Sequence, residues 1–218
     1  MRTKFFFLLA FLPALLCAQV PRDKIFNSPL TEAKRRRFEA ICAVMAAHPV
    51  ARGDFVQTKT ISRLGRTLVS RGVFTIARGE GMIWDTRSPY PSIMALGKDY
   101  LVEIAGGKKR RMDASGNMTF VRIAETMSAV FSGNIASLTA NFEIYFAETE
   151  RSWTLALVPK DGAIRQFAAA IIMEGESASS AVKSLRFYEQ GGDTVSYELS
   201  NQTYAQTLNA DEKACLSG

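Results

Sequence analysis

Near the start of the chain, apolar side chains recur with the period of a helix. Within residues 31–47, four of them fall at positions i, i+3, i+4 and i+7, the spacing of one face of an amphipathic helix. Thr31 is suited to cap the first turn, and Glu32 in that turn interacts favourably with the helix dipole. The side chains of this predicted apolar face are Phe38, Ile41, Cys42 and Met45.

Between residues 53 and 104 the apolar positions instead alternate with a period of two, as in half-buried strands. Short segments that contain glycine or proline interrupt the alternation, and each predicts a tight turn. Closely spaced strands with tight turns indicate an antiparallel meander rather than βαβ units. The predicted turns are 63–65, 78–81, 87–91, 97–99 and 106–108.

The second half of the chain repeats this order of a helix followed by strands. A helical pattern over residues 118–132 ends at Gly133, a natural residue to follow a helix. Its apolar stripe consists of Val121, Ala124, Met127, Val130 and Phe131. Further strands are predicted at 142–147, 152–158, 164–174, 182–189 and 195–200. The tail after Tyr204 shows no clear pattern.

These elements predict an α+β fold in a single domain over residues 19–218. Roughly nine to eleven antiparallel strands must bury one face, and only two or three helices are available to cover it. We therefore expect a strongly curved antiparallel sheet, an incomplete β-barrel of about eleven strands, with helices covering the concave face. Such curvature leaves an interior too wide for side chains to fill, so an apolar cavity is expected there.

The first 18 residues have the form of a secretory signal peptide. Arg2 and Lys4 precede an uncharged apolar run at 5–16, which is too short for a membrane-spanning helix of about 20 residues. Cleavage after Ala18 would release the protein into the periplasm. The alternative is processing at Cys17, which would leave a lipidated cysteine and a membrane-anchored lipoprotein.

The chain carries a formal net charge of +6, and part of the excess lies in two runs, KRRR at 34–37 and KKRR at 108–111. Such runs are found in nucleic-acid-binding proteins and, more commonly, on solvated faces. Neither run is interleaved with aromatic residues, and an exported protein rarely meets nucleic acid, so no nucleic-acid partner is expected. A basic patch could still meet anionic lipid head groups or an acidic partner.

Two cysteines, Cys42 and Cys215, remain outside the signal segment, one near each end of the domain. In an oxidising compartment they could form a disulfide that closes most of the chain into a loop. The alternative is that Cys42 is a small buried residue on the first helix and Cys215 a free thiol in the tail.

The residues do not favour an enzyme. The only histidine is His48, beside Pro49 at a predicted helix end, so a Ser-His-Asp or Cys-His arrangement could be built only through it. HExxH, CxxC and phosphate-binding glycine motifs are absent from the sequence. We therefore expect no catalytic residues, no metal site and no cofactor.

Several segments together resemble a known family. Residues 72–84, GVFTIARGEGMIW, match the family's Gly, Arg and Trp at Gly72, Arg78 and Trp84 without a gap. Further similar segments are FVQTK at 55–59, FSG at 131–133 and LVPK at 157–160. With the order of elements, they resemble the periplasmic outer-membrane lipoprotein carrier (LolA) family over nearly the whole exported chain.

The resemblance implies a monomeric periplasmic chaperone that binds the acyl chains of outer-membrane lipoproteins in a hydrophobic cavity and shuttles them from the inner to the outer membrane. Its implied partners are acylated lipoproteins or lipids, an inner-membrane donor complex and an outer-membrane acceptor. The alternative is a carrier of a glycolipid or other free lipid on the same fold. Two departures leave the cargo open: Gly79 replaces the family's Pro, and Met82 replaces an aromatic residue.

The resemblance also assigns roles to individual residues. The family's counterpart of Arg78 hydrogen-bonds backbone carbonyls of a helical lid and holds the empty cavity shut. The simpler alternatives are an exposed turn arginine for Arg78 and a core residue for Trp84. Strand residues expected to line the cavity are Trp84, Met82, Phe55, Phe74, Ile83, Ile93 and Met94. The underside of the lid would be formed by Val121, Met127, Val130 and Phe131.

Overall fold

The computed structural model describes residues 23–97, 99–113, 129, 134–179 and 181–217. The strands are β1 (Val50–Ile61), β2 (Arg66–Ala77), β3 (Gly81–Ser88), β4 (Ser92–Leu96), β5 (Tyr100–Ala105), β6 (Lys108–Asp113), β7 (Phe142–Glu148), β8 (Ser152–Pro159), β9 (Ala170–Glu176), β10 (Val182–Tyr188) and β11 (Thr194–Ala205). The described helices are η1 (Lys24–Asn27), α1 (Glu32–Ala47), η2 (Ser62–Leu64), α3 (Ile135–Asn141), α4 (Gly162–Phe167) and α5 (Ala210–Leu216).

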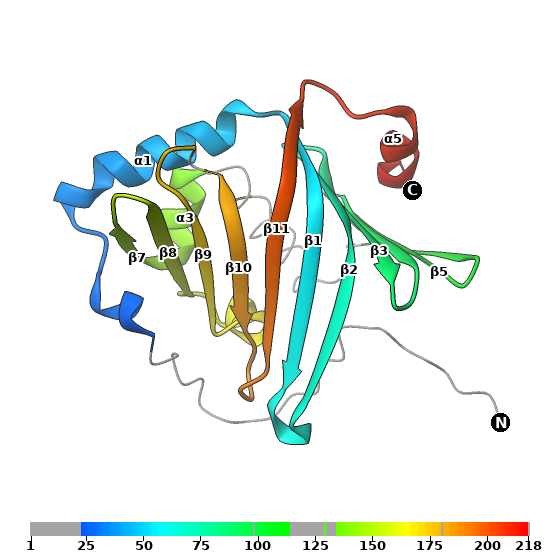
Figure 1. Cartoon of the computed structure of the whole chain (residues 1–218), viewed down its shortest axis with the longest axis horizontal. Coiled ribbons are helices and arrows are strands. Elements are labelled where there is room, and N and C mark those ends of the chain that lie inside the picture. The colour runs from blue at the N-terminus through cyan, green and yellow to red at the C-terminus, as the bar shows by residue number, and fades with distance from the viewer. Residues whose placement is uncertain (1–22, 98, 114–128, 130–133, 180, 218) are drawn as a thin grey trace.

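All eleven strands belong to one antiparallel sheet, in the order β6-β5-β4-β3-β2-β1-β11-β10-β9-β8-β7 (Figure 1). Sequence neighbours are sheet neighbours within each meander, and β11 returns to pair with β1 and join the two meanders. The sheet is not closed, because β6 and β7 remain at its edges. The predicted α+β fold, an incomplete barrel of about eleven strands, is confirmed.

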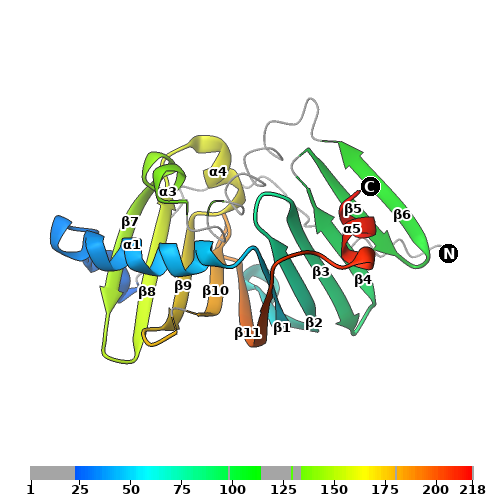
Figure 2. The same ribbon diagram turned by 90° about the horizontal axis from the view of Figure 1, so that it is seen from above.

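The main core lies between the concave face of the sheet and the helices over it. Seen from above, α1 crosses the strands of the C-terminal meander (Figure 2). Phe38, Ile41 and Cys42 of its predicted apolar face are buried in this core, and Met45 packs against it. Burial of a large apolar side chain contributes about 1.5–3 kcal/mol, so this stripe fixes α1 to the sheet. The predicted helix over 31–47 is confirmed, with Thr31 at the N-cap position.

The convex face carries smaller clusters near the two ends of the sheet. η1 places Ile25 against Ala156 and Ile172, under the C-terminal meander. α5 places Cys215 and Leu216 against an apolar cluster of β3, β4 and β5, under the N-terminal meander. The tail after Tyr204 therefore contains a helix that the apolar pattern did not predict.

Glu212 anchors α5 to the sheet. Its two carboxylate oxygens accept hydrogen bonds from Arg52 Nε and Nη2, each at 2.6 Å. Thr75 Oγ1 donates to Oε1 at 2.9 Å and the Asn209 backbone N–H donates to Oε2 at 2.8 Å. These bonds, led by the one from Arg52, lower the pKa of Glu212 to about 2 against the opposing effect of burial. Asn209 and Glu212 also form a capping box, the sequence signal for this helix start.

Two further elements differ from the predictions. The strand predicted at 164–174 begins too early, because residues 162–167 form α4 and β9 starts only at Ala170. A short apolar run can form either a helix or a strand, and periodicity alone does not separate the two. Helix α3 was also not predicted, and its N-cap is the Asn134 side chain, which accepts from the Ser137 N–H at 3.1 Å.

Some predictions fall outside the described residues. They are the signal peptide at 1–18 with Cys17, and the helix at 118–132, of which only Ala129 is described, in a helical conformation. Among the helices that are described, none has the length and apolar character needed to cross a membrane.

Candidate functional site

Arg78 joins the turn between β2 and β3 to the C-terminal end of α1. Its Nη1 donates a hydrogen bond to the carbonyl oxygen of Ala46, in the last turn of the helix. Its backbone N–H donates to the Pro49 carbonyl at 2.8 Å. The last carbonyls of a helix lack internal partners and carry partial negative charge, so a guanidinium is well suited to this position. Arg78 is therefore more than a solvated turn residue.

The residue that follows explains one departure from the family pattern. Gly79 has a backbone φ of +77°, which glycine adopts readily. Proline is locked at a φ near −65° and could not take this conformation. The turn after Arg78 thus has a backbone geometry that requires the glycine found here.

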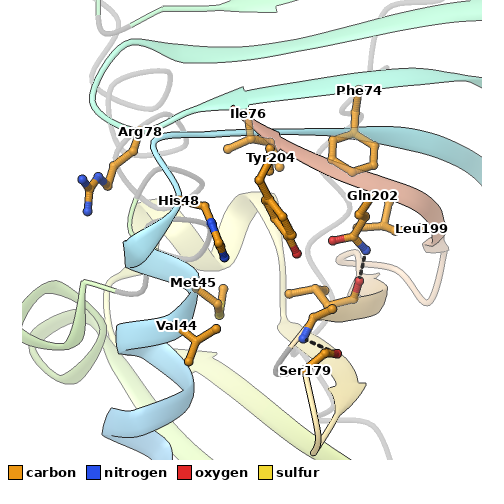
Figure 3. A pocket seen from close by; sticks show the side chains of 13 residues that line it. Val44, Met45, His48, Phe74, Ile76, Arg78, Ser179, Leu199, Gln202 and Tyr204 are labelled. Carbon is orange, nitrogen blue, oxygen red and sulfur yellow. Dashed lines mark hydrogen bonds between the residues drawn. The ribbon is translucent and has the colours of Figure 1, made fainter. Parts of the chain in front are cut away.

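A pocket of about 60 Å³ lies beside Arg78, between the end of α1 and the sheet (Figure 3). Its apolar walls come from α1, β1, β2, β10 and β11, and polar groups lie among them. Ligand sites usually measure about 300–1,000 Å³, so this pocket does not hold acyl chains as it stands. The lining residues are Val44, Met45, His48, Ala51, Phe74, Ile76, Arg78, Ser179, Ala181, Val182, Leu199, Gln202 and Tyr204.

His48, which ends α1, stacks on Tyr204 of β11 at this pocket. The ring centroids are 3.8 Å apart and the ring planes lie within 15° of parallel. Tyr204 remains 46% exposed, so the stacked pair is open to solvent on one side. His48 is thus a helix-end residue with an aromatic neighbour.

The structure brings together most of the strand residues expected to line a cavity. Trp84 lies 6.4 Å from Phe55 and 6.4 Å from Phe74 between ring centroids, and all three are buried on the concave face. Met82 belongs to the same buried cluster, and Met94 is opposite Trp84 across the β3–β4 pair. Trp84, Phe55, Phe74 and Met82 thus form one buried apolar cluster on the concave face, and Met94 extends it as a partly exposed neighbour.

Ile83 and Ile93 are not part of that surface, which corrects the expectation for both. They lie on the convex face, in the cluster beneath α5. Successive side chains of a strand point to opposite faces, so Ile83 cannot share a face with its neighbours Met82 and Trp84. The expected lid residues lie outside the described part of the chain: Val121, Met127, Val130 and Phe131.

Sequence reasoning missed Tyr197 of β11, at the centre of the concave cluster. Its ring contacts Phe55, Trp84 and Phe187, with centroid distances of 6.1, 5.7 and 6.1 Å. Burial raises the pKa of its hydroxyl well above the ordinary value, and Glu189 adds to the effect. The alternation of Val195 with Tyr197 was the available signal, because it places both on one face of the strand.

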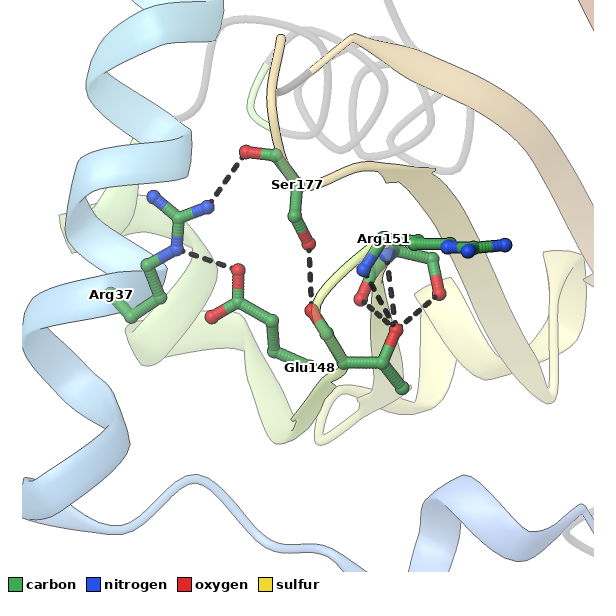
Figure 4. Close-up of polar contacts among 6 residues, drawn as sticks. Arg37, Glu148, Arg151 and Ser177 are labelled. Carbon is green, nitrogen blue, oxygen red and sulfur yellow. Dashed lines mark hydrogen bonds and ion pairs between the residues drawn. The ribbon is translucent and has the colours of Figure 1, made fainter.

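Polar contacts hold the N-terminal half of α1 to the C-terminal meander (Figure 4). Arg37 Nε donates to Glu148 Oε1 at 2.7 Å, and its Nη2 donates to the Ser177 carbonyl at 2.9 Å. Lys34 Nζ donates to the Phe146 carbonyl at 3.0 Å. The basic run at 34–37 is therefore partly used inside the fold and is not simply a solvated face.

The second basic run, KKRR at 108–111, lies on β6, an edge strand whose six residues are all exposed. Charged side chains on an edge strand discourage pairing with other chains, which is an ordinary structural use of such a run. Within the described residues, no group of three or more His, Cys, Asp or Glu side chains is placed to hold a metal ion.

The two cysteines do not form a disulfide. Both thiols are free, and the sheet separates them: Cys42 lies in the concave core and Cys215 in the cluster beneath α5. Burial, with a contribution from Glu39, raises the pKa of Cys42 to about 12. The structure therefore favours the alternative in which Cys42 is a small buried residue of the first helix.

Comparison with known proteins gives the family. The chain matches the family model of the outer membrane lipoprotein carrier protein LolA over residues 49–212. No curated protein sequence matches it.

Its fold is similar to that of an uncharacterized conserved protein from Thermus thermophilus, with a TM-score of 0.50, 7% identity, and coverage of 84% of this chain and 93% of the other. A LolA superfamily protein from Nitrosomonas europaea gives a TM-score of 0.42, 10% identity, and coverage of 80% and 94%. A putative outer membrane lipoprotein-sorting protein domain from Vibrio parahaemolyticus gives a TM-score of 0.43 and 10% identity, with coverage of 83% of this chain and 98% of the other. The likeness to the Thermus thermophilus protein concerns the fold alone. The family model spans most of the chain, and the chain therefore belongs to the LolA family of outer membrane lipoprotein carrier proteins.

Proposed function

We propose that this protein is a periplasmic carrier that shields the acyl chains of lipoproteins on the concave face of its sheet during transfer between two membranes. The observation that carries the proposal is the apolar concave face of the sheet, over which α1 lies. Arg78 connects the sheet to the end of that helix through its bond to the Ala46 carbonyl. Family membership supports the same role. The inner-membrane donor and outer-membrane acceptor belong to this proposal as partners.

In this proposal the site opens to take up cargo, because the pocket beside Arg78 has only about 60 Å³. Each acyl CH₂ group moved from water to an apolar site gains about 0.8 kcal/mol. Several long chains would therefore bind too tightly for onward transfer unless opening itself costs free energy. The bond from Arg78 to Ala46 supplies part of that cost by stabilising the closed form.

A release assay tests the proposal. Purified exported protein is incubated with spheroplasts, and lipoproteins released into the supernatant are identified together with their stoichiometry. A carrier releases a lipoprotein in a one-to-one complex. If no lipoprotein is released and lipid extraction of the purified protein yields a bound free lipid or glycolipid, the cargo is that lipid instead. If neither species is found, the carrier proposal is wrong.

Arg78→Leu tests the latch within that assay. Removal of its hydrogen bond favours the open form, so the variant should retain cargo more strongly and pass less of it to acceptor membranes. Arg151→Leu, an exposed arginine between β7 and β8, is the matched control and should behave as the unmodified protein. Unchanged transfer by Arg78→Leu would remove Arg78 from the mechanism.

The place of the protein in the cell is part of the proposal. Mass spectrometry of the exported chain distinguishes a free N-terminus after Ala18 from an acylated Cys17. An acylated Cys17 would make the protein membrane-anchored and would change the proposed shuttle into a fixed acceptor or donor.

A further inference from the structure

Three hairpin turns of the N-terminal meander lie at one end of the sheet. They are residues 62–65 between β1 and β2, 89–91 between β3 and β4, and 106–107 between β5 and β6. The strands are antiparallel and in register next to each turn, so these turns share the end opposite to Arg78. The β1–β2 turn forms the foot of the ribbon in Figure 1. We call this end of the meander the turn edge.

The β1–β2 hairpin projects beyond its neighbour on one side. β2 pairs with β1 along its whole length, from Arg66 to Ala77, but it pairs with β3 only from Arg71 onward. The projecting part is braced by the β10–β11 turn, because the Ser62 N–H donates to Asp193 Oδ1 at 2.9 Å. The tip is therefore held in a defined place and stands clear of β3.

The turn edge carries the most exposed large apolar side chains of the described chain. Leu64 at the tip is 65% exposed and Tyr90 in the next turn is 60% exposed. Leu68 and Val69 on the projecting part of β2 are 42% and 41% exposed. Leu64, Leu68 and Val69 belong to the projecting hairpin, with Leu68 and Val69 on its two opposite faces, and this group of exposed apolar side chains indicates a contact surface around the tip.

The charged side chains of the β1–β2 tip itself are positive, and Asp193 of the β10–β11 turn lies beside it at Ser62. Arg63 and Arg66 flank Leu64 closely in the sequence, and both are exposed. Ion pairs recorded within the described residues involve neither of them. In the β10–β11 turn, Glu189 forms an ion pair with Lys59, with Nζ and Oε1 3.2 Å apart. The tip thus presents a leucine between two arginines that no recorded ion pair neutralises.

We propose that the turn edge docks on an anionic lipid membrane through the projecting β1–β2 tip, with Leu64 in the interfacial layer and Arg63 and Arg66 on the lipid phosphates. Apolar side chains with a basic collar are the combination that binds such an interface. Arginine forms bidentate hydrogen bonds with phosphate, which suits Arg63 and Arg66 to this contact. Docking would concentrate the protein at the membrane while the Arg78 end stays free.

Vesicle binding by charge-reversal variants tests the proposal. Exported protein is sedimented with vesicles of phosphatidylglycerol and phosphatidylethanolamine, and in parallel with phosphatidylcholine vesicles. The double variant Arg63→Glu/Arg66→Glu should bind the anionic vesicles at least about tenfold more weakly, because each basic residue near the surface contributes to attraction. Leu64→Asn should also weaken binding about tenfold.

The matched control is Arg36→Glu/Arg151→Glu, which makes the same change in net charge away from the turn edge and should bind like the unmodified protein. All variants share one N-terminus, so a lipidated Cys17 would affect them equally. Absence of binding by the unmodified protein, or equal losses in both double variants, would overturn the proposal. Vesicle binding does not depend on the cargo. The carrier proposal can therefore be wrong while this inference is right, and this inference can be wrong while the carrier proposal is right.

Insertion of the tip has its own readout. Trp84 and Trp153 are 7% and 1% exposed, so a Leu64→Trp variant adds one tryptophan that membrane lipids can reach. Brominated acyl chains should quench its fluorescence, and insertion should shift its emission to the blue. Binding without quenching would mean that the protein adsorbs by charge alone, and would overturn the assignment of Leu64 to the membrane interface.

Discussion

The two halves of the sheet differ in how completely they are covered. In the C-terminal meander, α1 and α3 lie over one face and η1 over the other, and the first four residues of β9 are all buried. In the N-terminal meander, β6 is exposed along its whole length and the turns carry exposed apolar side chains. The C-terminal half is the more completely covered and is called the base here. The proposed membrane contact belongs to the less covered N-terminal half.

The same asymmetry governs α1. Lys34, Arg37 and Phe38 hold its N-terminal half to the C-terminal meander, and the apolar stripe continues along the helix to Met45. Its C-terminal end meets the N-terminal meander through Arg78. We therefore expect opening to begin at the Arg78 end, with the N-terminal half of α1 remaining in place.

The largest expected effect is loss of the buried tryptophan of the base. Trp153 is 1% exposed and packs over Gly175, where a Cβ would lie 2.3 Å from its ring. Trp153→Ala should lower the free energy of unfolding by about 3–5 kcal/mol, measured by urea denaturation. A loss well under about 1 kcal/mol would show that the base is not the stable half. Trp84→Ala is the counterpart in the other half, and it should also change cargo binding.

A smaller loss is expected where two strands of the N-terminal meander approach closely. A Cβ on Gly72 would lie 2.0 Å from the carbonyl oxygen of Asp85 on β3. Gly72→Ala should therefore cost about 1–3 kcal/mol in the same denaturation experiment, because the strands must move apart. Gly162→Ala has open space around the new methyl group and serves as the control. Equal stability of the two variants would contradict the close approach.

The anchor of α5 should give the protein an acid-dependent stability. Interactions with Arg52 lower the pKa of Glu212 from 4.5 to about 2. A lowered pKa contributes stability that is fully present above pH 4.5 and is lost as the pH falls through 2. Glu212→Gln should remove about 2 kcal/mol at neutral pH and flatten this part of the pH profile. An unchanged profile in the variant would show that another carboxylate is responsible.

The smallest expected effect concerns the polar contacts between the base and α1. Arg37→Ala removes the hydrogen bonds to Glu148 and to the Ser177 carbonyl, a loss of about 1 kcal/mol for partly exposed groups. Hydrogen exchange of the α1 amides should become faster, while the strands of the base are unaffected. Arg36→Ala, a neighbouring exposed arginine, should leave the exchange unchanged. Faster exchange in both variants would point to a cause other than the lost contacts.

Local patterns were sufficient to predict the frame of the molecule. The 3.6-residue stripe identified α1, and the alternation with glycine-bearing turns identified the strands of both meanders. Elements without a long apolar pattern were missed. α5 has only seven residues and is fixed by contacts from Arg52 and Thr75, which lie far away in the sequence.

The candidate site was predictable where it rested on one strand or one turn. The family resemblance pointed to Arg78 and Trp84, and strand alternation pointed to Phe55. The structure places Trp84 and Phe55 on the concave face and Arg78 at its rim, while their roles with cargo stay predictions. Ile83 was misplaced because strict alternation had not been applied to its strand. The roles of Arg37 and Tyr197 depend on partners from other elements, which a single sequence does not display.

The most direct test is the distance between the end of α1 and the β2–β3 turn. Spin labels at Val44→Cys and Glu80→Cys, in a Cys215→Ser background, report that distance. A second pair, Arg36→Cys with Arg151→Cys, reports the distance between the N-terminal half of α1 and the β7–β8 turn of the base. With cargo bound, or with Arg78→Leu, the first distance should lengthen while the second stays constant. If bound cargo leaves both distances unchanged, α1 is not the element that opens, and the carrier mechanism proposed for this fold is wrong.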